Sequence, residues 1–336
     1  MATFYKPITS SADVATTKTL LHEAIPLTGT ILSGTYSEAN IKTYTHGMFQ
    51  SVFDYPYLSS SANHILDLSC GFSSDSALSG ATSATEVSKK INIYNQFSQI
   101  LVGYDVTGTL MQFDKSGSAA SGVKMKEVFI VPFSRLLVKD EIKKGSFTVT
   151  LGTSTVYNTP FTTTSTIGDY QATSSYYANS PAGEYGLLFV SGALTQPVGH
   201  VYYQAGVAIL TASVFTTNFS GAVDVTGTVA SASINTVSDN FRRRIQNIQF
   251  NNTTELNSTI YFCRANHNEF NYSSNPTYLE DSQIVVKQYS TSSPVAYITT
   301  VGLYDDKDQL VAVAKLSEPL RKDPSTELTV RVRLDY

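Results

Sequence analysis

His267 and Glu269 are the residues whose types best suit metal chemistry, and they lie two positions apart in a polar loop. A protein metal site normally needs three or more ligands at helix or hairpin spacing, and this loop offers two. Residues 305–308, Asp-Asp-Lys-Asp, begin like a calcium-binding loop. They lack the glycine at the sixth position and the glutamate at the twelfth that such a loop uses. We therefore expect no metal and no cofactor, and we interpret residues 305–308 as a hairpin turn.

Three consecutive arginines, Arg242, Arg243 and Arg244, form the longest basic run of the chain. Such a run could bind a phosphate or a carboxylate. Charge runs are more often solvated faces, and the chain as a whole carries a net charge of −4. We favour a solvated or subunit-contacting edge, where the arginines form ion pairs between subunits.

The motifs of the common enzyme classes are missing from the sequence. It contains no GxSxG, HExxH, P-loop or GxGxxG motif, and its five histidines are scattered. Paired carboxylates for glycoside hydrolysis are set by the fold and not by sequence spacing, so a glycan hydrolase stays open as an alternative. We expect that the protein is not an enzyme.

The composition suits burial of the surface against other proteins. Charged residues make up 15% of the 336 residues, against about 25% in an average globular protein. The chain has 21 Tyr and 17 Phe but no Trp, and Ser, Thr and Asn take the place of the charges. Such a surface can be covered with little desolvation of ions. The negative net charge disfavours direct binding of nucleic acid, and no run of about 20 apolar residues predicts membrane insertion.

The pattern of the sequence predicts a mainly β fold of antiparallel, sandwich-like sheets with long polar loops. One clear α-helix is expected at residues 85–102, with Thr85 as N-cap and an apolar stripe that runs from Val87 to Leu101. The last strand alternates with a period of two, which is typical of a half-buried strand that pairs within the subunit or with a neighbour. Its apolar positions are Leu328, Val330, Val332 and Leu334, and the sequence ends at Tyr336.

The chain is expected to divide into four segments. Residues 1–40 form an N-terminal arm or a loosely packed strand, and residues 41–150 form a β-rich domain that contains the helix. Residues 151–240 are β-rich, with long Ser/Thr loops at 152–180 and 216–240. Residues 241–336 form a C-terminal β-rich segment. Two hairpins are also expected, one at 102–113 and one in which residues 146–151 return after the charged cluster 139–144.

Several segments resemble a family of virion structural proteins of contractile-tailed bacteriophages from marine and cyanobacterial hosts. They are FDYPYLSSSANHILDLSCG (53–71), INIYNQFSQILVGYD (91–105), SRLLVKDEIKKGSFTVTL (134–151), NSPAGEYGLL (179–188), YFCRANHNEFNYSSNPTYL (261–279) and YITTVGLYDDKDQLVAVAKLSEPL (297–320). The resemblance implies a particle subunit, assembled in the bacterial host cytoplasm, whose partners are other virion proteins and copies of itself. It names no functional residues and does not fix the position in the particle.

We therefore expect a subunit of the tail, baseplate or neck, held in place by β-edge pairing and aromatic contacts. The candidate assembly residues are Arg242, Arg243, Arg244, Leu328, Val330, Val332, Leu334 and Tyr336. A host-surface adhesin that binds glycan through exposed Tyr and Asn is the first alternative, and a particle-borne glycan hydrolase is the second.

Overall fold

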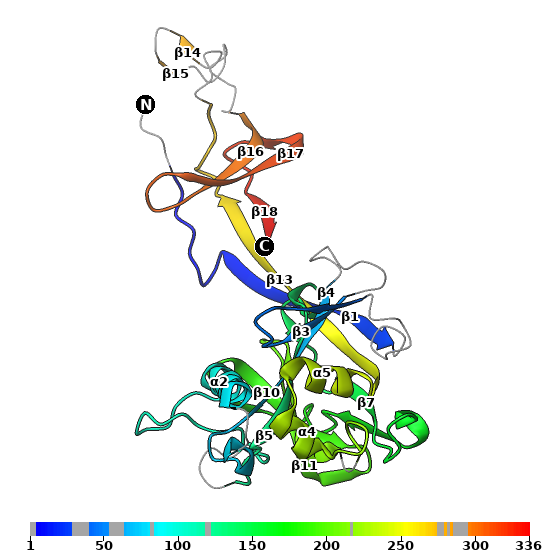
Figure 1. The fold of residues 1–336 in the computed structure, drawn as a ribbon. Helices are drawn as coiled ribbons and strands as arrows, with labels where there is room; N and C mark the ends of the chain where they lie inside the picture. Colours follow the sequence, from blue (N-terminus) through cyan, green and yellow to red (C-terminus); the bar gives the residue numbers. More distant parts are fainter. Residues whose placement is uncertain are drawn as a thin grey trace. The chain divides into compact units, whose positions relative to one another are not determined.

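The structure is a computed structural model, and the mainly β prediction is confirmed, with 48% of the residues in strands and 17% helical (Figure 1). It describes residues 5–28, 40–53, 64–80, 84–117, 122–215, 218–273, 279–280, 283–284 and 295–336.

The chain forms two compact units. A central unit comprises Leu21–Thr254, and a discontinuous unit comprises Met1–Leu20 together with Glu255–Tyr336. These bounds differ from the four expected segments, because neither 150 nor 240 separates the units. The expected arm 1–40 is divided between them and carries a long strand, β1 (Val14–Thr28).

An antiparallel sheet forms the framework of the central unit. Its strands follow the order β13-β7-β8-β10-β11-β12-β5-β4-β3-β2, with β9 beside β10 and β6 beside β13. Their bounds are β2 Ile41–Thr43, β3 Gln50–Phe53, β4 His64–Phe72, β5 Glu127–Pro132, β6 Glu141–Ile142, β7 Thr148–Gly152, β8 Thr164–Gly168, β9 Tyr177–Ser180, β10 Gly183–Val190, β11 Ala193–Tyr202, β12 Val207–Thr211 and β13 Ile245–Ala265.

Helix α2 (Ala84–Leu101) confirms the expected helix and contacts β4. It begins one residue before Thr85, so Thr85 lies inside the helix and is not its N-cap. The approach to β4 is close at Gly71. A Cβ atom there would lie 2.8 Å from the Lys90 carbonyl oxygen and 2.9 Å from the Tyr94 nitrogen. Glycine at this position therefore lets helix backbone lie directly against the strand.

The prediction of a loop at 216–240 is wrong. The described part of this segment holds helices α4 (Val225–Ser231) and α5 (Ile234–Arg242), capped by the side chains of Asp224 and Ser233. Its Ser, Thr and Val residues have modest helix propensity. Tertiary packing overrides that propensity, because the apolar residues of α5 at helical spacing, Ile234, Val237 and Phe241, are all buried.

One of the two expected hairpins differs from the structure. Both β6 and β7 pair with β13, so residues 146–151 do not return along the 139–144 cluster. The hairpin expected within 102–113 is confirmed in short form: an antiparallel bridge joins Tyr104 to Leu110, and the turn is closed by a hydrogen bond from the Gly108 amide to the Asp105 carbonyl oxygen. The expected loop 152–180 contains β8 and β9, because both strands find partners in β10.

Strands dominate the discontinuous unit as well. The C-terminal strand β18 (Leu328–Asp335) pairs antiparallel with β13, so the prediction of a paired last strand is confirmed within the chain itself. Strands β16 (Ala296–Tyr304) and β17 (Leu310–Lys322) form a separate two-stranded sheet. The short strands β14 (Leu279–Glu280) and β15 (Gln283–Ile284) pair with each other. Across the described part of the chain, no helix is long and apolar enough to cross a membrane.

Candidate assembly surface

The hydrophobic core lies in the central unit. Among the described residues, every buried member of the core cluster falls between Leu27 and Phe250. In the discontinuous unit, the described apolar residues that are buried are few, and none is an aromatic: Ile260, Ala265, Val295, Ala296, Leu303 and Val332. Units with so little buried apolar surface usually need further contacts to be stable. Contacts with partner chains would therefore add most stability to the discontinuous unit.

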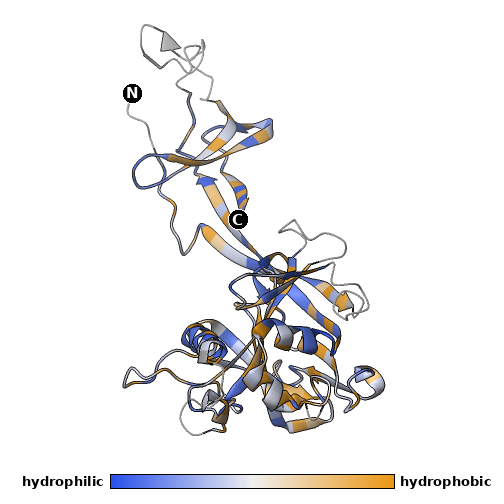
Figure 2. Cartoon of the chain, in the orientation of Figure 1, coloured by the Kyte–Doolittle hydropathy of each residue, from blue (hydrophilic) through white to orange (hydrophobic). Residues whose placement is uncertain are grey.

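The β16–β17 hairpin carries large apolar side chains that the chain leaves exposed. Figure 2 colours parts of both strands as hydrophobic. The exposed large apolar residues of the hairpin are Tyr297, Tyr304, Leu310, Val311, Val313 and Leu320. A two-stranded sheet is marginally stable by itself, and strands of this length gain stability when a face is covered. We call this element the apolar hairpin.

The exposed residues near the tip of the apolar hairpin share one face. Val313 pairs with Gly302, and the register shifts between Leu303 and Tyr304, so that Val311 is an extra residue in β17. The ring of Tyr304 and the side chain of Leu310 lie over Gly302, where a Cβ would meet them at 3.0 Å and 3.2 Å. The bulge thus leaves Leu310 and Val311 both exposed beside Val313, instead of alternating.

Tyr5 and the turn complete the surroundings of this face. The ring centroids of Tyr5 and Tyr304 are 4.9 Å apart. Asp305 forms the turn through its Oδ1 atom, which accepts hydrogen bonds from the Lys307 and Gln309 amides at 2.9 Å and 2.7 Å. The expected hairpin turn at 305–308 is therefore confirmed.

Lys322 fixes the base of the apolar hairpin. This lysine is fully buried, and its Nζ donates to the His267 carbonyl oxygen at 3.2 Å, to Asn271 Oδ1 at 2.6 Å and to the Asp323 carbonyl oxygen at 2.9 Å. The polar loop at 266–271 therefore serves as an acceptor for a buried ammonium group.

The two metal candidates of that loop have other partners. Glu269 forms an ion pair with Lys6 at 2.5 Å, which holds the pKa of the Glu269 carboxyl below its usual range. The exposed His267 lies 3.4 Å from Glu327. Within the described residues, no group of three or more His, Cys, Asp or Glu side chains could hold a metal ion. The absence of a metal remains a prediction.

The last strand keeps its predicted alternation. Val332 is buried, Leu328, Val330 and Leu334 are half-buried, and the residues between them are exposed. The exposed Tyr336 exchanges backbone hydrogen bonds with Asn257. These residues hold the strand to β13 within one chain, which accounts for them without a neighbouring subunit.

The arginine run is not a solvated edge, and that interpretation is corrected. Arg242 and Arg244 are 1% and 3% exposed, and of the three only Arg243 is exposed. Arg244 Nη1 donates to the carbonyl oxygens of Gly152 and Ser154, both at 3.0 Å, and its Nη2 donates to that of Asn218 at 2.7 Å. Burial lowers the pKa of the Arg244 guanidinium. Arg244 therefore binds backbone of its own chain and cannot pair with another subunit.

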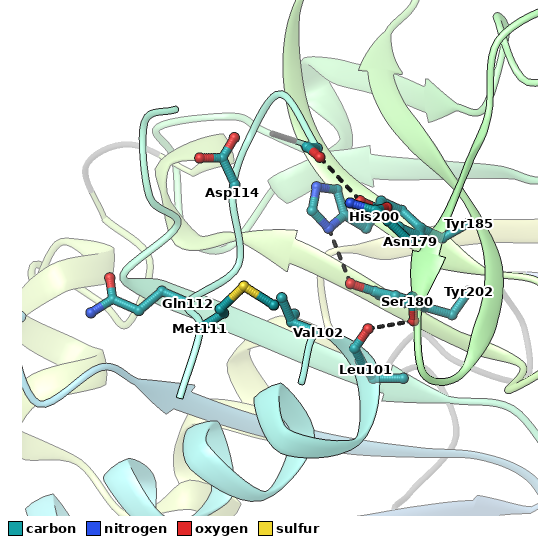
Figure 3. A pocket seen from close by; sticks show the side chains of 11 residues that line it. Leu101, Val102, Met111, Gln112, Asp114, Asn179, Ser180, Tyr185, His200 and Tyr202 are labelled. Atoms are coloured by element: carbon teal, nitrogen blue, oxygen red, sulfur yellow. Dashed lines mark hydrogen bonds between the residues drawn. The ribbon is translucent and has the colours of Figure 1, made fainter. Parts of the chain in front are cut away.

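A small cavity of about 20 Å³ lies beside His200 in the central unit (Figure 3). Tyr185, Tyr202 and Asn179 line it (Figure 3), and so does Asp114, whose carboxylate forms an ion pair with Lys124 at 2.8 Å. His200 Nδ1 is 3.4 Å from the Tyr202 hydroxyl, and Nε2 has no hydrogen-bond partner among the described residues. This volume is close to that of one water molecule, so the cavity is too small for an organic substrate.

Acid should weaken the central unit through His200. Burial lowers the pKa of this imidazole to about 4, whereas in the unfolded chain it is about 6.5. Protons therefore bind the unfolded state more readily, and this contribution to stability is complete above pH 6.5 and lost as the pH falls toward 4. We expect a loss of about 2 kcal/mol between pH 7 and pH 5. The His200→Gln variant should lack this part of the slope in urea unfolding, and an identical slope in both proteins would contradict the assignment.

Comparisons with family models, with curated proteins and with solved structures found no match. The candidate site therefore rests on geometry. The expected assembly residues fall in two units: the arginine run lies in the central unit and β18 in the discontinuous unit. The sequence-based interpretation also missed the exposed tip of the apolar hairpin. The available signal was the uncharged run 310–314 directly after a turn.

Proposed function

We propose that this protein is a structural subunit of a tailed-phage virion, in the tail, baseplate or neck, and that it works by assembly and not by catalysis. One observation carries the proposal: the apolar hairpin leaves Leu310, Val311 and Val313 exposed in a unit with little core of its own. The resemblance to virion proteins and the low charge content point the same way.

The physical reason is the cost of leaving this surface in water. Burying a side chain such as Leu or Val contributes about 1.5–3 kcal/mol, so several such groups on one hairpin strongly favour a covered state. The discontinuous unit cannot cover them with its own described residues, because those that are buried already form its small interior. A neighbouring chain in a particle would do so.

Hydrogen exchange on the isolated chain and on virions from the phage that encodes it tests the proposal. We expect the amides of β16 and β17 to exchange quickly in the isolated chain and to be protected in virions. Strands β5 and β12, inside the core of the central unit, are the internal control and should be protected in both states. Equal exchange of the hairpin in both states, or absence of the chain from purified virions, would contradict assembly through this surface.

A further inference from the structure

We infer that the outer face of the apolar hairpin binds the same face of a second copy of this chain, about a twofold axis. This inference deepens the proposed function and rests on it for its biological setting, because it names the partner of the exposed surface. Three features of this face support it: its apolar centre, its two oppositely charged ends, and the absence of ion pairs at those ends among the described residues.

The centre of the face is apolar. Leu310, Val311 and Val313 are all more than half exposed, and Tyr304 extends the surface toward Tyr5. No charged side chain lies between Gln309 and Lys315 in the sequence. A partner that covers this centre would remove no charged group from water. The main cost of burying the centre is therefore absent.

The two ends of the face carry opposite charges. Asp306 and Asp308 stand at the turn with the exposed Lys307 between them, and together with Asp305 they make the turn net acidic. Lys315 lies two residues beyond Val313, hence on the same side of the strand. Asp306, Asp308 and Lys315 are exposed, and none of the three forms an ion pair within the described part of the discontinuous unit.

Such a face is complementary to itself. In a contact about a twofold axis perpendicular to the strands, the same patch meets its copy in the opposite direction. The acidic turn of one copy then lies near Lys315 of the other, twice in each dimer, and the apolar centres meet between them. A parallel arrangement would instead place like charges together, which disfavours it.

The expected dimer is weak and reversible. Stable interfaces bury more than about 1,200 Å², and a patch of about five side chains provides less. In a particle, the other contacts of each subunit would hold neighbouring copies together and raise the effective concentration of the patch.

Sedimentation velocity over a range of concentrations tests the inference on the full chain. We expect a monomer–dimer equilibrium that weakens as salt is added. The V311T/V313T variant replaces two apolar side chains with more polar ones of the same shape. It should weaken association at least about tenfold. Val123→Thr is the matched control, because Val123 in the central unit is 68% exposed and Val311 is 67% exposed; it should leave association unchanged.

A charge exchange tests the identity of the partner. Lys315→Glu should weaken self-association about tenfold, and the triple variant K315E/D306K/D308N should restore it, because the turn, with Lys307, then carries a net positive charge opposite the acidic position 315. Asp305 is left intact, since it forms the turn. A failure of the triple variant to restore association, or an equal loss in the Val123→Thr control, would overturn the twofold contact.

The outcomes separate this inference from the proposed function. A wild-type chain that stays monomeric at its highest soluble concentration, yet is found in virions with a protected hairpin, overturns the twofold contact and leaves the structural role standing. A chain that dimerises as described but is absent from virions supports the contact and removes the virion role.

Discussion

Replacing Arg244 with alanine should destabilise the protein by about 3–5 kcal/mol. The variant leaves three backbone carbonyl groups, those of Gly152, Ser154 and Asn218, without their donor in a buried site. It also removes a guanidinium that lies 5.6 Å and 5.4 Å from the ring centroids of Phe215 and Phe219. Because domains are stable by only about 5–15 kcal/mol, the urea midpoint should fall sharply.

Arg243 provides the matched control for this prediction. It is the adjacent residue with the same side chain, it is exposed, and its Nη1 donates to the Tyr157 hydroxyl at 3.2 Å. Arg243→Ala should change stability by no more than about 0.5 kcal/mol. If the two alanine variants unfolded at the same urea concentration, the structural role assigned to Arg244 would be wrong.

Replacing Gly71 with alanine should cost about 3 kcal/mol, at the upper end of the range for overpacked cores. The added methyl group would lie within 2.9 Å of two backbone atoms of α2, at Lys90 and Tyr94. Backbone of a helix cannot rotate away as a flexible side chain can, so α2 would have to move from β4. Urea unfolding followed by circular dichroism measures the loss.

Gly80→Ala is the control for added volume and for lost backbone freedom. A Cβ at Gly80 would meet no atom of the described residues within 4 Å. This variant should be neutral or slightly stabilising, because alanine restricts the unfolded chain. Should Gly71→Ala prove as mild as Gly80→Ala, the close approach of α2 to β4 would not be the reason for glycine at position 71.

Local features of the structure could be predicted from the sequence. The helix near 85–101, the turn at 305–308 and the alternating last strand follow from spacings and turn residues within a few positions of one another. Such patterns set which side chains share a face, whatever the rest of the chain does. The mainly β class follows from the same periodicities.

The tertiary structure alone decided which charged and apolar residues are buried. Arg244 is enclosed by carbonyl groups that lie 92, 90 and 26 positions away along the chain, which no local pattern encodes. Helices α4 and α5 form in a Ser/Thr-rich segment because their apolar residues meet the distant core. Residues 310–314 read as an ordinary strand, and they become a candidate assembly surface only because no described part of the chain covers them. Burial depends on which residues are neighbours in the folded structure, whereas the sequence shows only which residues are neighbours along the chain.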